Sequence, residues 1–240
     1  MGILARIFLG VVGTAYSILP AWLRHFKARA TGALLMFLGP RRAVIEENLE
    51  RFLPGDDPAT VLRRKKLVGA AYRHLAELTF EISMLFGPKR LLYRWAERHE
   101  KVEGYEHWVQ ANALGKGVLF LSSHVGNWEI MAAVGGTHKT NLMLVTKRLK
   151  PAWFHDAIEQ GRLANDVKGT YEPRTFRDVL SHLKTGGTVG IVLDQYAGPP
   201  VGVRVPLFGV PVGTHMVMAM IAKRTGAAVI PVVNYRLPDG

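Results

Sequence analysis

The 240-residue chain is basic, with 31 Lys and Arg against 19 Asp and Glu and a formal net charge of +12. A surplus of this size favours anionic partners: nucleic acid, an anionic membrane surface or an acidic protein. The length fits one domain, alone or with a membrane-anchoring segment. Because these residues include no cysteine, they exclude disulfides, thiolate nucleophiles and cysteine-ligated zinc.

The N-terminal segment indicates contact with a membrane. The first 45 residues contain no Asp or Glu, and an apolar run over residues 7–22 is bordered by arginine and lysine. A cleaved signal peptide would need small residues directly after the run, where charged residues follow instead. A transmembrane helix needs about 20 apolar residues, and Pro20 interrupts the end of this run. We therefore expect a monotopic or re-entrant hydrophobic helical anchor over residues 1–40, with a single span as the alternative.

The next segment has the pattern of helices separated by Pro and Gly. Residues 43–53 predict a short helix that Pro54 and Gly55 end. Asp57 before Pro58 is typical of a helix N-terminus. The helix that follows runs to about Phe86, because its apolar residues recur every three or four positions.

From residue 117 onward, short apolar runs alternate with helical patterns. Strands are expected at 117–121, 142–145, 189–193 and 228–233, with a short one near 167–171, and helices at 127–134, 151–164, 175–183 and 214–225. This alternation predicts an α/β fold with a largely parallel central sheet flanked by helices. We assign residues 41–240 to one catalytic domain. The chain ends directly after a predicted buried strand, so we expect a natural C-terminal part to follow.

The segment from Gly117 to Glu129 carries the clearest chemical signal. It combines a buried strand, a turn with His124 and the first turn of a helix with Glu129. Across such a corner, the carboxylate can accept a hydrogen bond from one imidazole nitrogen and leave the other as a base. Ligands of open α/β sheets lie at this end of the strands. The structural alternative is that His124 caps the helix and Glu129 favours its first turn.

The sequence His124-Val-Gly-Asn-Trp-Glu129 resembles the His-x4-Glu signature of the late acyltransferases of lipid A biosynthesis. These lauroyl and myristoyl transferases are relatives of the glycerolipid acyltransferases, which carry His-x4-Asp. The resemblance is colinear over roughly residues 40–236, and family members normally continue further. The other matching segments are 41–53, Gly161-Arg162, 183–187, Asp194-Gln195, 205–209 and 227–231.

The resemblance implies a membrane-bound O-acyltransferase. The donor would be an acyl thioester, usually on acyl carrier protein, and the acceptor a hydroxyl of a lipid A precursor or similar glycolipid. His124 would deprotonate that hydroxyl, Glu129 would orient the imidazole, and Arg162 would stabilise the oxyanion. The alternative for Arg162 is a solvated arginine at a helix end. The family works at the cytoplasmic face of the bacterial inner membrane.

The residues expected to bind substrate lie beside these three. Asn127 and Trp128 lie within the signature, and Asp194 and Gln195 follow a predicted buried strand. For Asp194 and Gln195, the alternative is a polar turn without a role in the site. Their place at the carboxyl end of a strand favours a supporting role.

Other chemistry is not indicated. A serine nucleophile on a sharp elbow would need Gly-x-Ser-x-Gly, which does not occur. The histidines have no metal-ligand spacing, so we assign neither a metal nor a cofactor. Nucleic-acid binding is discounted because the cationic clusters lie beside apolar runs and no nucleic-acid motif is present. Two alternatives stay open: an acyltransferase acting on a glycosylated phospholipid, lysophospholipid or aminolipid, and a non-catalytic membrane-surface protein with a vestigial dyad.

Overall fold

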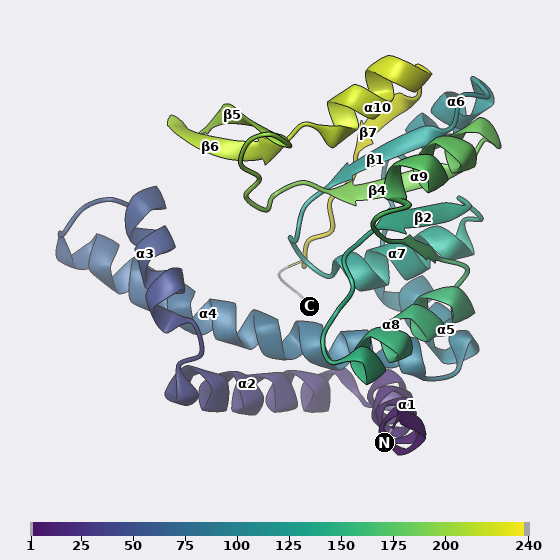
Figure 1. Ribbon diagram of the computed structural model, residues 1–240. Helices are drawn as coiled ribbons and strands as arrows, with labels where there is room; N and C mark the ends of the chain where they lie inside the picture. The colour runs from purple at the N-terminus through teal and green to yellow at the C-terminus, as the bar shows by residue number, and fades with distance from the viewer. Residues whose placement is uncertain (1, 238–240) are drawn as a thin grey trace.

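The computed structural model describes residues 2–237 and has a five-stranded central sheet in which every pairing is parallel (Figure 1). The strand order β3-β2-β4-β1-β7 places β1 and β4 at the centre. The strands are β1 (Val118–Ser122), β2 (Leu142–Val145), β3 (Lys168–Thr170), β4 (Thr188–Val192) and β7 (Ala228–Pro231). The expected α/β class with a largely parallel sheet is therefore confirmed.

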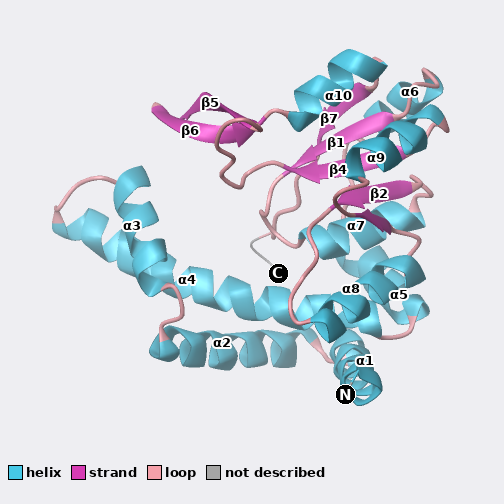
Figure 2. Ribbon diagram, in the orientation of Figure 1, coloured by secondary structure: helices cyan, strands magenta, loops and turns pink. Residues whose placement is uncertain are grey.

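Helices cover both faces of this sheet (Figure 2). On one face, α9 (Thr175–Lys184) and α10 (Val217–Thr225) pack against Leu119 of β1 and Val189 of β4. On the other face, α7 (Trp128–Thr137) packs against Phe120 and Leu144. Because successive strand residues point to opposite faces, Leu119 and Phe120 belong to different clusters.

Helices from the first hundred residues form a layer beyond α7 (Figure 1). They are α1 (Gly2–Ile18), α2 (Ala21–Leu38), α3 (Arg42–Phe52), α4 (Pro58–Ser83), the 3₁₀ turn η1 (Met84–Phe86) and α5 (Lys89–His99). Tyr16 of α1 is buried in a core cluster with residues of η1, α5 and α7. In α2, a Cβ at Gly32 would lie 2.8 Å from Arg73 Cα, so this glycine permits close packing on α4.

The segment expected to be an N-terminal anchor forms two helices, and its anchoring role stays a prediction. Pro20 separates α1, of 17 residues, from α2, whose 18 residues include Arg24, Lys27 and Arg29. Among residues 2–237, no helix combines the length and apolar composition that crossing a bilayer requires. The single-span alternative is therefore wrong for this part of the chain. The expected boundary near residue 40 falls in the turn between α2 and α3.

One helix and one two-stranded hairpin were missed by the sequence patterns. Helix α6 (Tyr105–Ala113) precedes β1, and strands β5 (Gly202–Leu207) and β6 (Val210–His215) form an antiparallel hairpin. The helix expected from residue 214 begins at Val217, because 214 and 215 belong to β6. The hairpin turn places Phe208 and Gly209 at positive φ, as a primed two-residue turn requires. The sequence did not predict this turn, because its first position is Phe208 and not the Asn, Asp or Gly typical of such turns.

Candidate active site

A tight corner between β1 and α7 carries His124. The Asn127 side chain caps α7 by accepting a hydrogen bond from the Ile130 amide at 3.1 Å. Gly126 has φ +64°, and a Cβ there would lie 2.1 Å from the carbonyl oxygen of Asn234. Only glycine fits this position, because the backbone is left-handed there and the segment after β7 passes against it at Asn234. The sequence Gly-Asn therefore sets the path of the chain beyond His124.

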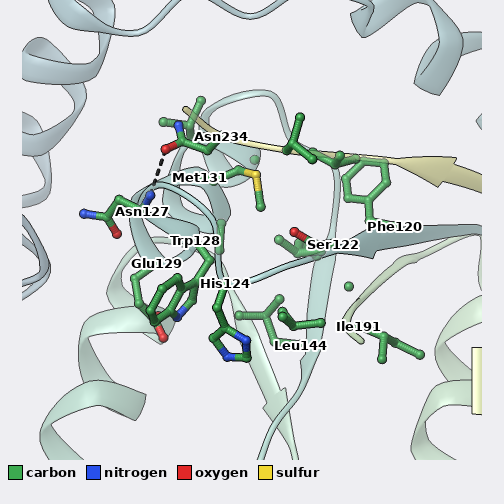
Figure 3. Close-up of a pocket in the computed structure, with 18 of the residues that line it drawn as sticks. Phe120, Ser122, His124, Asn127, Trp128, Glu129, Met131, Leu144, Ile191 and Asn234 are labelled. Carbon is green, nitrogen blue, oxygen red and sulfur yellow. Dashed lines mark hydrogen bonds between the residues drawn. The ribbon is translucent and has the colours of Figure 1, made fainter. Parts of the chain in front are cut away.

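The imidazole of His124 is held by Asp194, which follows β4. Nδ1 lies 2.7 Å from Asp194 Oδ1, and the His124 amide donates to Oδ2 at 2.8 Å. Since a carboxylate only accepts, Nδ1 carries the proton and Nε2 is left as the basic nitrogen. The Trp128 indole packs edge to face on the imidazole, with ring centroids 4.7 Å apart (Figure 3). His124 thus has a fixed tautomer and a fixed ring plane.

Glu129 forms a buried ion pair with Arg162 of α8 (Ala152–Ala164). The guanidinium donates twice to this carboxylate, from Nη2 to Oε1 at 2.5 Å and from Nε to Oε2 at 3.0 Å. Its Nη1 donates to Glu159 at 2.9 Å. Burial alone would lower the pKa of Arg162, but hydrogen bonds and attraction from Glu129 and Glu159 raise it above its usual value. Arg162 therefore stays charged between two carboxylates.

The pairing expected between Glu129 and His124 differs from the one observed. Among the described residues, the carboxylate that contacts the His124 imidazole is that of Asp194. Glu129, in the first turn of α7, pairs instead with Arg162 of α8. The solvated alternative for Arg162 is wrong, because this side chain is buried. Asp194 carried a signal, its place at a strand end, but sequence alone did not reveal that β4 neighbours β1. Neither set of contacts assigns a catalytic role, so the roles of Glu129 and Arg162 stay predictions.

A second buried network supports the corner from α4 and from the tail after β7. Asn127 Nδ2 donates to Glu81 at 2.8 Å, and the Asn127 amide donates to the Asn234 side chain at 2.8 Å. Arg236 donates to both oxygens of Glu81, at 2.5 and 2.7 Å. Asn127, expected to bind substrate, is thus engaged with protein groups. The buried Glu81 was missed because it lies within the apolar pattern of α4.

A cavity of about 1350 Å³ opens beside His124. His124, Trp128, Glu129, Arg162 and Gln195 line it near the corner. Farther along the sheet its wall is apolar and includes Phe120, Met131, Leu142, Leu144 and Ile230. Charged residues line other parts of it, among them Arg24, Lys101 and Arg148. Ligand sites are typically concave and combine apolar walls with polar groups, as this cavity does.

Comparison with known proteins agrees with the resemblance seen in the sequence. The family model described as "Bacterial lipid A biosynthesis acyltransferase" matches residues 3–240. The chain belongs to this family. It is 28% identical over 210 residues to "Lipid A biosynthesis lauroyltransferase" of Escherichia coli (strain K12). The matched part is 86% of this chain and 65% of that relative, so the chain spans less than two thirds of its length.

Proposed function

We propose that this protein is an O-acyltransferase that moves a fatty acyl chain from an acyl thioester to a hydroxyl of a lipid A precursor or similar glycolipid. The observation that supports it most is His124, fixed by Asp194 beside a large cavity whose lining includes many apolar side chains. A base beside such a cavity suits a reaction between a lipid hydroxyl and an acyl chain. Family membership and the E. coli relative support the same activity.

In this mechanism His124 Nε2 removes the proton of the acceptor hydroxyl. The oxygen attacks the thioester carbonyl carbon, and the π pair moves onto the carbonyl oxygen. Collapse of this intermediate breaks the C–S bond, and the leaving thiolate takes the proton from the imidazolium. Asp194 compensates the charge of the imidazolium, so its role is the one the family pattern suggested for Glu129. No acyl-enzyme forms, and neither a metal nor a cofactor takes part.

Glu129 and Arg162 shape the site in this proposal. Their bidentate, buried pair ties the first turn of α7 to α8, and both residues line the cavity. Gln195 and Trp128 line the cavity beside His124 and contact the substrates. Of the two residues of the family signature, His124 then acts directly as the base. Glu129 acts by positioning, because it keeps the helix behind His124 in place.

We further propose that the protein works on the cytoplasmic face of the bacterial inner membrane, with acyl carrier protein as donor. Large apolar side chains on α1 and α2 are exposed, among them Phe8, Trp22, Phe26 and Phe37. Exposed apolar residues next to cations are typical of a helix that lies on an anionic lipid surface. The net charge of +12 also suits an acidic carrier protein.

Acyl transfer by the purified protein tests this function. Acyl carrier protein loaded with defined chains and a lipid A precursor serve as substrates, and mass spectrometry detects the product. His124→Ala should lose roughly 10²- to 10⁴-fold in rate, the usual contribution of a general base. Gln110→Ala, a change of an exposed residue on α6 that does not line the cavity, is the control. A folded His124→Ala protein with normal turnover would contradict the mechanism. If the protein transfers acyl chains only to a glycosylated phospholipid, lysophospholipid or aminolipid, that lipid is the acceptor in place of the lipid A precursor.

A further inference from the structure

The hydroxyl of Ser122 is buried without a partner in the wall of the cavity. Ser122 is 8% exposed and lines the cavity. Within residues 2–237, its Oγ makes no hydrogen bond. Nearly all buried polar groups in folded proteins are hydrogen-bonded, so a buried hydroxyl without a protein partner is unusual. The Ser122 hydroxyl is therefore not engaged with the protein and is available to a molecule bound in the cavity.

The strand places this hydroxyl between the apolar wall and His124. Ser122 is the last residue of β1, two positions after Phe120 and two before His124. Phe120 and Ser122 share a face because alternate strand residues do, and His124, in the turn that follows, lines the same cavity. Leu119 and Leu121 belong to the cluster on the opposite face. Figure 3 shows Phe120, Ser122 and His124 in this order along the chain as it enters the corner.

An acyl thioester with its alkyl chain along Phe120 and its carbonyl carbon near His124 passes Ser122 at its polar end. We propose that the Ser122 hydroxyl is a catalytic hydrogen-bond donor to the carbonyl oxygen of the acyl thioester. This proposal rests on the proposed function and names a contact for its donor substrate. As the acceptor oxygen attacks, the π pair moves onto the carbonyl oxygen, and the hydrogen bond from Ser122 strengthens. The hydroxyl keeps its proton, and no bond forms to Oγ.

Two observations separate this role from the nearest alternatives. Among the described residues, Ser122 has no hydrogen bond to His124, so the base that would activate it as a nucleophile is not engaged with it. Arg162, the cation suggested by the family pattern for the oxyanion, uses three of its five N–H groups on Glu129 and Glu159, which hold its guanidinium in place. Ser122 has its donor free.

The test combines kinetics with stability. Ser122→Ala should lower kcat by about 10²-fold with a smaller change in KM, because a donor to the oxyanion acts mainly in the transition state. Ser122→Thr keeps a hydroxyl and should retain more activity than Ser122→Ala. Ser123→Ala, at the neighbouring half-buried position, is the matched control and should keep wild-type kcat. Unfolding in urea should show Ser122→Ala to be at least as stable as the wild type, since the change removes an unpaired buried hydroxyl.

A second measurement does not depend on turnover. In the His124→Ala protein, infrared spectra of a bound thioester labelled with ¹³C at its carbonyl should show the carbonyl band at lower frequency when Ser122 is present than in the His124→Ala/Ser122→Ala protein. Identical bands, or a Ser122→Ala enzyme with unchanged kcat, would overturn the role of Ser122 while leaving the proposed function intact. A wild-type protein that neither binds nor turns over acyl thioesters would contradict both.

Discussion

Nδ1 of His124 lies 2.7 Å from Oδ1 of Asp194, although the two residues are 70 positions apart in the sequence. The register of the central strands explains this contact. Ser122, the last residue of β1, is paired with Val192, the last residue of β4. Each site residue follows two positions after its strand, so parallel pairing brings both to one edge of the sheet. The contact is therefore a direct consequence of sheet order.

Asp194→Asn should impair catalysis without unfolding the protein. The amide cannot compensate the positive charge that His124 acquires, so we expect kcat to fall by roughly 10²-fold or more. Steady-state kinetics on the purified variant measure this loss. Asp166→Asn is the control, because Asp166 is an exposed acid paired with Lys89. Equal rates for both variants would exclude Asp194 from the mechanism.

Breaking the ion pair of Glu129 and Arg162 should reduce stability strongly. Removing one partner leaves the other charge buried and unpaired, which typically costs roughly 3–5 kcal/mol. Arg162→Met should therefore lower the urea midpoint, and Arg162→Lys should not restore it, since lysine cannot make the bidentate contact. Arg42→Met removes an exposed pair with Glu46 and should change the midpoint little. Similar losses at the two sites would show that burial of the Glu129 pair contributes nothing.

Gly126→Ala should disturb the turn that carries His124. The new Cβ meets both a left-handed backbone and the Asn234 carbonyl oxygen, which would be 2.1 Å away. We expect a loss of roughly 1–3 kcal/mol in stability and a lower kcat. Gly186→Ala is the control that adds backbone strain without a new contact, because Gly186 has φ +75° and no atom within 4 Å of its added Cβ. Equal effects at the two glycines would mean that the tail at Asn234 does not support the corner.

Glu100 predicts a specific dependence of stability on pH. Burial, and then the neighbouring charge of Glu81, raise the pKa of the Glu100 carboxyl above its ordinary value of 4.5, although Arg236 opposes this. The folded state therefore holds this proton more tightly than the unfolded state, so the group stabilises the fold as pH falls from the raised pKa towards 4.5. Glu100→Gln should be more stable than the wild type at pH 7 and should show a flatter pH profile. Urea unfolding at a series of pH values checks this. A variant that is less stable at pH 7 would contradict the prediction.

The exposed aromatic residues of α2 should contribute to membrane binding. Trp22, Phe26 and Phe37 are 70%, 64% and 86% exposed. Burying such a side chain in lipid is worth roughly 1.5–3 kcal/mol, so replacing any of them with Ser should weaken binding to anionic vesicles by about tenfold or more. Leu114→Ser is the control, because this exposed residue follows α6 at the other end of the molecule (Figure 1). Binding that remains should fall with salt, because surface cations are screened. Unchanged binding of the α2 variants would place the membrane contact elsewhere.

Local patterns in the sequence were sufficient for the elements of the core and for the corner. Alternating apolar runs and helical stretches gave all five strands of the sheet, and Gly126-Asn127 marked the start of α7. These features depend on residues close together in the chain, whose side-chain period and turn preferences act locally. The same segment carried the family resemblance that the comparison confirmed.

The partners of the site residues were decided only by tertiary structure. His124 and Glu129 are five positions apart, and the sequence fits a dyad between them. In the structure, strand order brings Asp194 to His124, and helix packing brings Arg162 to Glu129. The contacts of Glu81 with Asn127 and Arg236 join three distant segments, and the pattern of α4 alone did not signal them. Hydrogen bonds and ion pairs are short-ranged, so which carboxylate holds the imidazole depends on which elements the folded chain places side by side.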